Sequence, residues 1–413
     1  EELELQAVSP PVSEYVIQHE TSIRMIDPDL WNSLLGGKGT YDWNALSVLE
    51  ESFQHNKEPQ DNWGFHYFII RDQLNKPVLA TFCTLALTKD DMLSPVAISH
   101  KIELERIVNR YYLCSRTLMI GSLVTEGKQM YIDRSRPDWK NVMMFFLDTL
   151  WKEQEKQKAN MLNLRDFDTG DTEMQEFLLN QGFLKINLPD NHIIQHLSSN
   201  RETYLQKLRK KDRYYIRTRA IENEHHFEVN VVSHASYGDI SHYYQLYKNV
   251  ARKNIGLNMF HLPRKFFRQL AKNPQWEIIT IKSKSDNCLA GVAFSYKTAN
   301  TYNSAMIGMD YTYTDQHIYS QILWQIVLRA QQLNLEFINL GLTSSQNKRK
   351  FGAEVIQQVA FVQISDNYNM SVINTIANTG IVPAVTKPEQ KKISSKRIEI
   401  LKKRKITNTK SHK

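Results

Sequence analysis

The sequence predicts an α/β fold of two domains in tandem, each with a mixed, mostly antiparallel sheet flanked by helices. The first observation is a repeat. A strand-like segment at 130–133 leads through a polar stretch to a Trp-containing helical pattern at 141–158 and an apolar strand at 161–164. The same order recurs within 307–340, about 175 residues later, which is the length of an ordinary domain. The second observation is that hairpin-like strand pairs precede one late helix-to-strand crossover, which favours a mixed sheet over a doubly wound one.

The first half begins with a short amphipathic helix and continues with strands. Apolar residues spaced by three and four predict the helix around 46–53. Segments rich in β-branched and aromatic residues, separated by polar turns, predict two hairpin-like pairs. The expected strands are 65–71 with 77–87, and 119–124 with 129–132 across the turn at 125–128.

The second half opens with a long helical pattern at 202–224 whose outer faces are strongly basic. In the later helix at 318–333, apolar residues recur at the 3.6-residue period and predict one buried face. Pro263 suits the first turn of another helix. The remaining expected elements are helices at 243–250 and 263–271 and strands at 277–282, 289–296, 301–309 and 337–340.

Composition and charge indicate a folded, multidomain protein. The 413 residues carry a formal charge of +8, much of it in the last 30 residues. We therefore predict a linker at 1–14, a first domain at 15–197, a second at 198–380 and a basic, flexible tail at 381–413. The chain starts without Met on an acidic segment, which is compatible with a piece of a longer protein.

The cysteines and the hydropathy favour a cytoplasmic protein. Three cysteines, Cys83, Cys114 and Cys288, lie far apart and are odd in number, which favours a reducing compartment over a disulfide framework. We expect no membrane span and no signal peptide, since the sequence has no apolar run of about 18 residues. We also expect no metal site, because the adjacent His225 and His226 lack the spacing that places two ligands on one helix face.

Several segments, taken in order, resemble the GNAT superfamily of acyl-CoA N-acyltransferases, in the tandem form shared with Fem-type peptidoglycan aminoacyl ligases. The likeness runs from about Tyr15 to Asn369. It is also similar to tandem modules fused behind PLP-dependent, aminotransferase-like enzymes, so a fused or associated enzyme of that class is an expected partner. The segments are 121–127, 139–158, 164–166 and 178–183 in the first half, and 204–213, 308–311, 340–341 and 348–352 in the second.

The resemblance implies transfer of an acyl group from acetyl-CoA or another acyl-CoA to the amine of an amino acid-like small molecule. In this family a splayed pair of central strands offers backbone N–H groups to the thioester oxygen, and the next loop and helix start bind the pyrophosphate. By position these are 308–311 and 314–321. The implied catalytic residues are Asp310, Tyr311 and Glu126. The implied donor-binding residues are Lys348, Lys350, His317 and Tyr319, with Arg134 and Arg136 at the matching place in the first half.

The sequence departs from the family pattern, and each candidate has a plainer interpretation. Residues 312–318 contain no glycine, and Asp315 would repel a pyrophosphate. Asp310 beside a turn could simply bind backbone, and Glu126 could belong to a hairpin made by Gly127. Three consecutive cations at 348–350 are often a solvated surface.

Which half is catalytic therefore stays open, and two other hypotheses remain. In the first, the protein is a Fem-type ligase that uses aminoacyl-tRNA, bound through the basic helix at 202–224. In the second, it is a non-catalytic scaffold module for a PLP-dependent enzyme.

Overall fold

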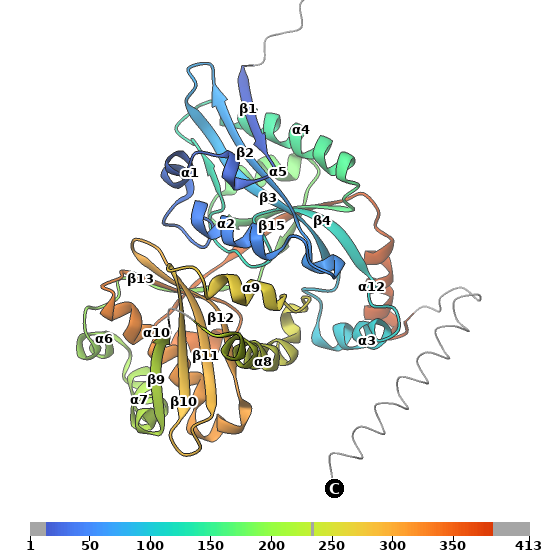
Figure 1. Ribbon diagram of the computed structural model, residues 1–413. Helices are drawn as coiled ribbons and strands as arrows, with labels where there is room; N and C mark the ends of the chain where they lie inside the picture. Colours follow the sequence, from blue (N-terminus) through green and yellow to red (C-terminus); the bar gives the residue numbers. More distant parts are fainter. Residues whose placement is uncertain (1–13, 233–234, 383–413) are drawn as a thin grey trace, which may run out of the picture.

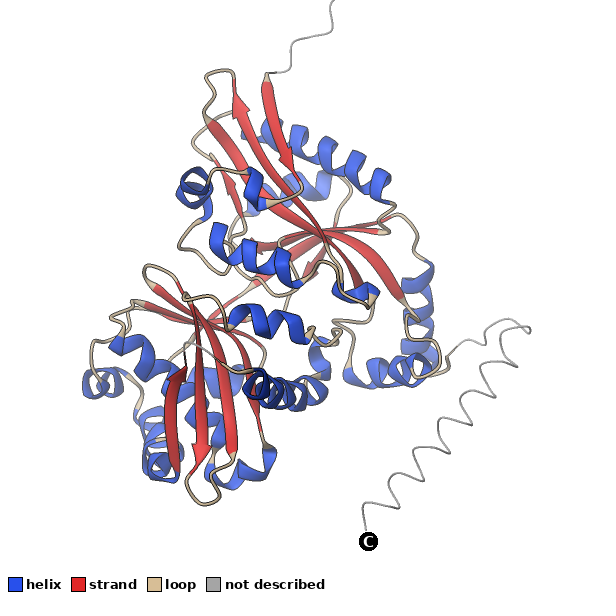
Figure 2. Ribbon diagram, in the orientation of Figure 1, coloured by secondary structure: helices blue, strands red, loops and turns tan. Residues whose placement is uncertain are grey.

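The computed structural model describes residues 14–232 and 235–382 and arranges them as two domains that pack against each other (Figure 1). Helices flank both sheets (Figure 2). Almost all of the expected linker at 1–14 and of the expected tail at 381–413 lies outside the described residues.

The first sheet has one parallel strand pair, β4 with β6, among otherwise antiparallel described pairs. Alternating small, β-branched and aromatic side chains bury almost all of β3 from both faces. In spatial order the described strands are β1 (Tyr15–Glu20), β2 (Gly64–Asp72), β3 (Pro77–Lys89), β4 (Cys114–Ile120), β6 (Met161–Asp168), β15 (Gln358–Ile364) and β7 (Leu184–Asn187), with β5 (Met130–Ile132) paired to β3.

The second sheet repeats this arrangement, again with one parallel pair, β12 with β13, in its described part. The two mixed, mostly antiparallel sheets confirm the predicted fold class. In spatial order the described strands are β14 (Glu354–Ile356), β8 (Asn191–Ile194), β13 (Phe337–Leu342), β12 (Thr301–Met309), β11 (Leu289–Lys297), β10 (Trp276–Ser283) and β9 (Phe227–Val232).

The domains exchange strands. β15, near the end of the described chain, inserts between β6 and β7 of the first sheet. β8, which precedes the second domain, pairs with β13 and β14 of the second sheet. Each sheet thus includes a strand from the sequence range expected for the other domain, and the boundary between residues 197 and 198 stays a prediction.

Helices cover the sheets with apolar faces that the sequence makes visible. In α10 (Ile318–Gln332), Ile318, Ile322, Ile326 and Ala330 are buried on one side, as the period predicts. The equivalent helix of the first domain is α4 (Trp139–Gln157). The other described α-helices are α1 (Pro28–Leu35), α2 (Trp43–Ser52), α3 (Val96–Arg106), α5 (Thr172–Asn180), α6 (Arg201–Lys207), α7 (Lys210–Arg219), α8 (Tyr237–Lys253), α9 (Arg264–Leu270), α11 (Ser345–Lys350) and α12 (Tyr368–Thr379).

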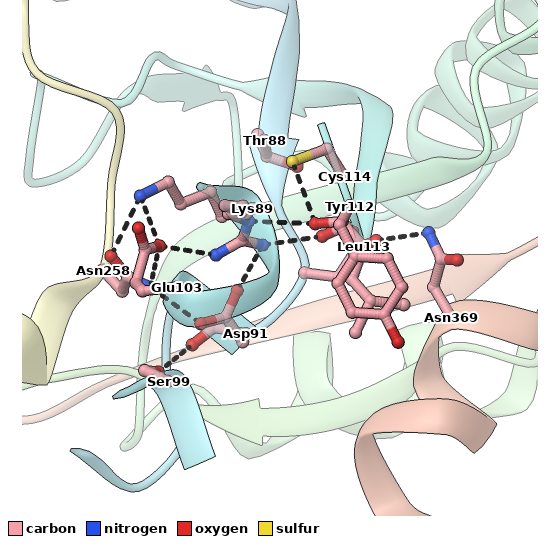
Figure 3. Close-up of polar contacts among 12 residues, drawn as sticks. Thr88, Lys89, Asp91, Ser99, Glu103, Tyr112, Leu113, Cys114, Asn258 and Asn369 are labelled. Carbon is pink, nitrogen blue, oxygen red and sulfur yellow. Dashed lines mark hydrogen bonds and ion pairs between the residues drawn. The ribbon is translucent and has the colours of Figure 1, made fainter. Parts of the chain in front are cut away.

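An apolar core joins the domains. One cluster of buried side chains runs from α2 to α9 and on to β10 and β11. The rings of Phe53 and Phe266 have centroids 5.3 Å apart across this junction. Beside it, Asn258 of the second domain donates to Asp91 at 2.8 Å and accepts from Lys89 at 3.1 Å, both in the first domain (Figure 3). Burial of this kind favours a fixed arrangement of the domains.

Two sequence-based predictions are wrong. The single helix expected at 202–224 is α6, α7 and a 3-10 segment at Ile221–His226, because Leu208 is extended (φ −79°, ψ 153°) and ends α6. The strand pair expected from 119–124 and 129–132 does not form. Instead, β4 and β5 both pair with β3, and residues 121–129 form a loop between them.

None of the described helices combines the length and apolar character needed to cross a bilayer.

Candidate active site

β12 and β13 separate part-way along their length and open the second sheet. They pair in parallel from Thr301 with Phe337 to Asn303 with Asn339, where the described ladder ends. Just beyond, the register of β12 with β11 skips Ala305, which marks a bulge. Because a bulge bends and twists its strand, β12 turns away from β13 here. Beyond Asn303, the described ladder no longer pairs the backbone of β12 with β13.

The first sheet opens at the equivalent place. β4 and β6 pair from Thr117 with Met161 to Met119 with Asn163. A little further along β6, Asp166 has φ 65°, a left-handed conformation that a non-glycine residue adopts at some cost and that clusters at functional sites.

Each opening leads into a cavity between the domains. The cavity of the second domain has a volume of about 540 Å³, and that of the first domain about 450 Å³. Both volumes suit a small-molecule ligand. The cavities adjoin, because both are lined by Leu123, Arg165, Leu257, Met259 and Leu342.

Glu126 belongs to the first domain but reaches the opening of the second. Its loop turns at Gly127, whose φ of 100° favours glycine. Its carboxylate lies against Gly341 of β13, where an added Cβ would be 3.5 Å from Oε1, and it accepts the backbone N–H of Leu342. Burial raises the pKa of Glu126 and the nearby Asp166 carboxylate raises it further, while Lys348 acts in the opposite direction. A carboxylate with a raised pKa is better suited to accept a proton near neutral pH.

Lys348 lies at the same opening, on α11. Its side chain is buried, and its Nζ donates to the carbonyls of Gly341 at 3.0 Å and Leu342 at 2.5 Å. Burial lowers its pKa to about 8, and the Glu126 carboxylate partly offsets this. The structure therefore brings together two of the predicted residues, one from each domain.

Three further polar residues complete this cluster and were not selected from the sequence. Arg165 donates to the Ser122 carbonyl at 2.6 Å and lies 3.2 Å from Asp166 Oδ2. His192 of β8 donates from Nδ1 to the Gly341 carbonyl at 3.0 Å. Arg165 and Asp166 belong to the segment 164–166 that resembles the family, so the resemblance could have identified them. The sequence around His192 contains no motif that would have identified it.

Asp310 and Tyr311, the other predicted catalytic residues, have different surroundings. Asp310 caps the 3-10 segment η5 (Tyr311–Gln316), accepting from the Thr312 backbone N–H at 2.9 Å and from its hydroxyl at 2.8 Å. Asp310 does not line either cavity among the described residues. Tyr311 does line the 540 Å³ cavity, with the Lys253 ammonium 3.3 Å from its ring centroid.

His317 and Tyr319 flank the start of α10. His317 is the N-cap residue, with φ 58°, and its Nε2 accepts from Arg219 at 2.8 Å. Tyr319 lines the 540 Å³ cavity beside Ser344, and burial raises its pKa to about 12. Of these two, Tyr319 is in position to contact a ligand in the cavity.

Lys350 lies outside the cavity, in a basic groove between α7 and α11. Its ammonium is 4.1 Å from the centroid of the Tyr215 ring. The groove is open and has a volume of about 790 Å³. Its charged lining residues are Arg209, Lys211, Asp212, Arg219, Arg349 and Lys350.

Arg134 and Arg136 are occupied by carboxylates of their own domain. Arg134 pairs with Asp171 at 2.7 Å and stacks on Trp139 at 3.8 Å. Arg136 pairs with Asp72 and with Asp138, both at 2.8 Å. A phosphate would have to displace these partners, so this end of α4 is poorly prepared for a coenzyme.

Comparison with known proteins agrees with this geometry. Residues 209–349 match the family model described as Acetyltransferase (GNAT) domain. No curated protein sequence matches the chain significantly. Among solved structures, "Crystal structure of FemX" is similar over 87% of this chain and 99% of that chain, with 10% identity and a TM-score of 0.57.

Two further similar structures have TM-scores below 0.5. One is a "Tandem GNAT protein from the clavulanic acid biosynthesis pathway", with 9% identity, 85% of this chain and 99% of that chain covered, and a TM-score of 0.49. The other is L-PGS from Bacillus licheniformis, with 10% identity, 85% and 94% covered, and a TM-score of 0.48. The family match, the FemX-like fold and the two equivalent sheets confirm the resemblance: residues 209–349 match a GNAT acetyltransferase domain, and the chain folds as two equivalent α/β domains in tandem.

Proposed function

We propose that the protein is an N-acyltransferase whose reaction takes place in the 540 Å³ cavity, with Glu126 as the general base. One observation carries the proposal. Glu126 extends from a loop of the first domain to the point where β12 and β13 of the second domain separate. A proton acceptor and exposed backbone N–H groups thus meet in one partly enclosed space, as acyl transfer requires.

The reaction follows from these groups. The Glu126 carboxylate takes a proton from the substrate ammonium, and the freed amine attacks the acyl carbonyl carbon. The carbonyl oxygen gains negative charge, which the N–H groups of β12 beyond Asn303 stabilise. The new C–N bond forms as the C–S bond of a thioester breaks. Lys348 gives a proton to the leaving thiolate and takes one from the new amide nitrogen, while Glu126 releases its own proton to solvent. The lowered pKa of Lys348 makes its ammonium a proton donor suited to the thiolate.

The proposed donor is an acyl-CoA, and the acceptor is the amine of an amino acid-like molecule. The neighbouring carboxylates of Glu126 and Asp166 favour a cationic acceptor at the junction of the two cavities. Tyr311 and Tyr319 border the same space and provide apolar walls for an acyl chain.

The test begins with donor binding and then removes the base. Acetyl-CoA at about 100 times its Kd should stabilise the fold by roughly 2.7 kcal/mol, seen as a saturable thermal shift.

Once a donor is identified, the release of free thiol is measured with each of a panel of amino acids as the acceptor. Glu126→Gln should lower kcat by about 10²–10⁴-fold and preserve donor binding. Glu155→Gln, at an exposed position of α4, is the matched control and should leave kcat unchanged. A Glu126→Gln variant with kcat within twofold of the wild type would exclude the proposed base.

Aminoacyl-tRNA is a second candidate donor, favoured by the basic groove. Five cations face an open groove beside the start of α10, with Asp212 as the carboxylate among its lining residues. Phosphate contacts make binding depend on salt, with a slope of about −0.7 to −0.9 per contact. Under this alternative, the affinity for tRNA falls steeply as the salt concentration rises. The double variant Lys211→Glu with Arg349→Glu should have a shallower dependence on salt. Lys284→Glu, exposed on another turn of the second domain, is the control. A slope identical in all three proteins argues against tRNA.

A further inference from the structure

Two histidines and a glutamate meet in the first domain, away from the cleft. Residue 19 of β1 lies opposite Phe68 of β2, and His66 is two residues from Phe68. Successive side chains of a strand alternate between faces, so His19 and His66 share a face. α4 covers that face: the rings of Phe68 and Phe146 pack edge to face at 5.5 Å. Glu153 continues the buried side of α4 and comes to lie over the two histidines.

The three ligand atoms are close enough to share one ion. His19 Nε2 is 3.0 Å from His66 Nδ1, which is 3.8 Å from Glu153 Oε1. All three atoms lie within 4.8 Å of one another. A tetrahedral zinc site with bonds of about 2.0–2.2 Å places its ligand atoms about 3.3–3.6 Å apart. These two separations bracket that range, and the His19 and Glu153 atoms, at most 4.8 Å apart, would approach each other as their side chains adjust.

Burial prepares the group for a metal. His66 and Glu153 are 4% and 6% exposed, and the half-buried His19 is held against the Phe68 ring at 4.4 Å. Burial lowers the pKa of both His66 and His19. Neutral imidazole is the form that binds a metal.

The neighbouring groups leave the site usable. Lys156 lies 3.6 Å from Glu153 Oε2, and its positive charge acts on both histidines and opposes a cation, although Glu153 partly neutralises it. Gln157 donates to Oε1 at 2.7 Å and would give up that contact. The Glu20 carboxylate, adjacent to His19, adds negative charge that favours a cation.

We propose that His19, His66 and Glu153 form a three-ligand site for a divalent transition metal, with Zn²⁺ the best fit to a donor set of two imidazoles and a carboxylate. A water would take the fourth position, from the side where His19 meets solvent. None of the three ligands lines either cavity described above. The ion would therefore tie β1 and β2 to α4 and stabilise the first domain without taking part in acyl transfer.

The test uses the full chain, freed of metal by dialysis against a chelator. Zn²⁺ competition with a chromophoric chelator gives the number of sites and their Kd, and thermal unfolding with and without Zn²⁺ gives the stabilisation. The wild type should bind Zn²⁺ and unfold at a higher temperature with it. His66→Gln and Glu153→Gln should each remove one equivalent, or weaken it at least tenfold, and abolish the thermal shift. His100→Gln, at an exposed position of α3, should behave as the wild type.

His19→Gln guards against a folding defect in the buried variants, because His19 is half-buried on a strand with one exposed side. It should also lose the equivalent of zinc while keeping the wild-type circular dichroism spectrum. Co²⁺ adds an independent readout: the site predicts visible d–d absorption without the near-ultraviolet band of a thiolate ligand. Wild-type protein that binds no Zn²⁺, or zinc binding unchanged in all three ligand variants, would overturn the proposal.

Discussion

Replacing Arg106 with Met should destabilise the first domain by about 3–5 kcal/mol, because it removes the cation of a buried ion pair and leaves the carboxylate of Asp91 buried without it. The guanidinium donates to Asp91 Oδ1 at 2.6 Å, to the Tyr112 carbonyl at 2.9 Å and to the Leu113 carbonyl at 3.0 Å. The side chain of Arg106 is 4% exposed and that of Asp91 0%. Figure 3 shows Asp91 among these partners.

The magnitude follows from what remains after the substitution. Asp91 keeps a hydrogen bond from Asn258 at 2.8 Å but loses its cationic partner. Among the described residues, the Tyr112 carbonyl is left with only the Cys114 thiol at 3.6 Å, which costs about 1–3 kcal/mol for a buried group that loses its strong donor. The Leu113 carbonyl keeps the Asp90 N–H at 3.0 Å. Methionine recovers part of this by filling the volume. For a domain of 150–250 residues, 3–5 kcal/mol corresponds to a fall of roughly 6–20 °C in Tm.

The assay is thermal unfolding followed by circular dichroism, with Arg110→Met as the control. Arg110 also pairs with a carboxylate, Glu58, but their side chains are 54% and 35% exposed. An exposed pair contributes about 0–1 kcal/mol, so the control should unfold near the wild-type temperature. The double variant Asp91→Asn with Arg106→Met should recover part of the loss, because it removes the uncompensated charge. If Arg106→Met lowers Tm no more than Arg110→Met does, the reasoning is refuted.

Three further predictions concern the cleft and its surroundings. Asp310→Ala should cost about 1 kcal/mol in urea unfolding through the lost cap yet keep kcat; a hundredfold fall in kcat would instead make Asp310 catalytic. Gly341→Ala should lower activity at least tenfold, because a φ of 72° strains an alanine and the backbone beside Glu126 would shift; wild-type kcat would contradict this. Burial alone would raise the pKa of Glu103, but hydrogen bonds, first from Lys89, hold it at about 2, below the ordinary 4.5. Its stabilisation is therefore present above about pH 4.5 and is lost as pH falls towards 2. The stability difference between wild type and Glu103→Gln, measured by urea unfolding from pH 7 to pH 3, should shrink; a constant difference would contradict it.

The sequence predicts the parts of the fold that depend on local periodicity. The helix expected at 318–333 is α10 to within one residue, because its apolar face repeats every 3.6 residues. The helix expected at 202–224 fails because its basic residues continue across the break, and an extended Leu208 leaves no mark in composition. The exchange of β8 and β15 between the sheets could not be predicted from the sequence either, because pairing between distant segments depends on tertiary packing.

The sequence also predicts only part of the candidate site. Glu126 and Lys348 follow from the resemblance and lie together, while Asp310 caps a turn and Lys350 faces the basic groove. The group of His19, His66 and Glu153 was missed entirely. Its members come from three elements, and a search for ligands spaced along one helix does not detect a group assembled by strand register and helix packing.

The position of Glu126 means that neither half of the chain contains the proposed site alone. The opening between β12 and β13 provides strand backbone and Lys348, but the carboxylate that we propose as the base comes from the loop after β4. That loop is held by Asp166, which accepts the backbone N–H of Gly127 and a hydrogen bond from Gln129. Strand exchange and the apolar core between α2 and α9 fix the two domains against each other. Because a general base must lie within hydrogen-bond reach of the proton it removes, a fixed junction between the domains is itself a requirement of the proposed chemistry.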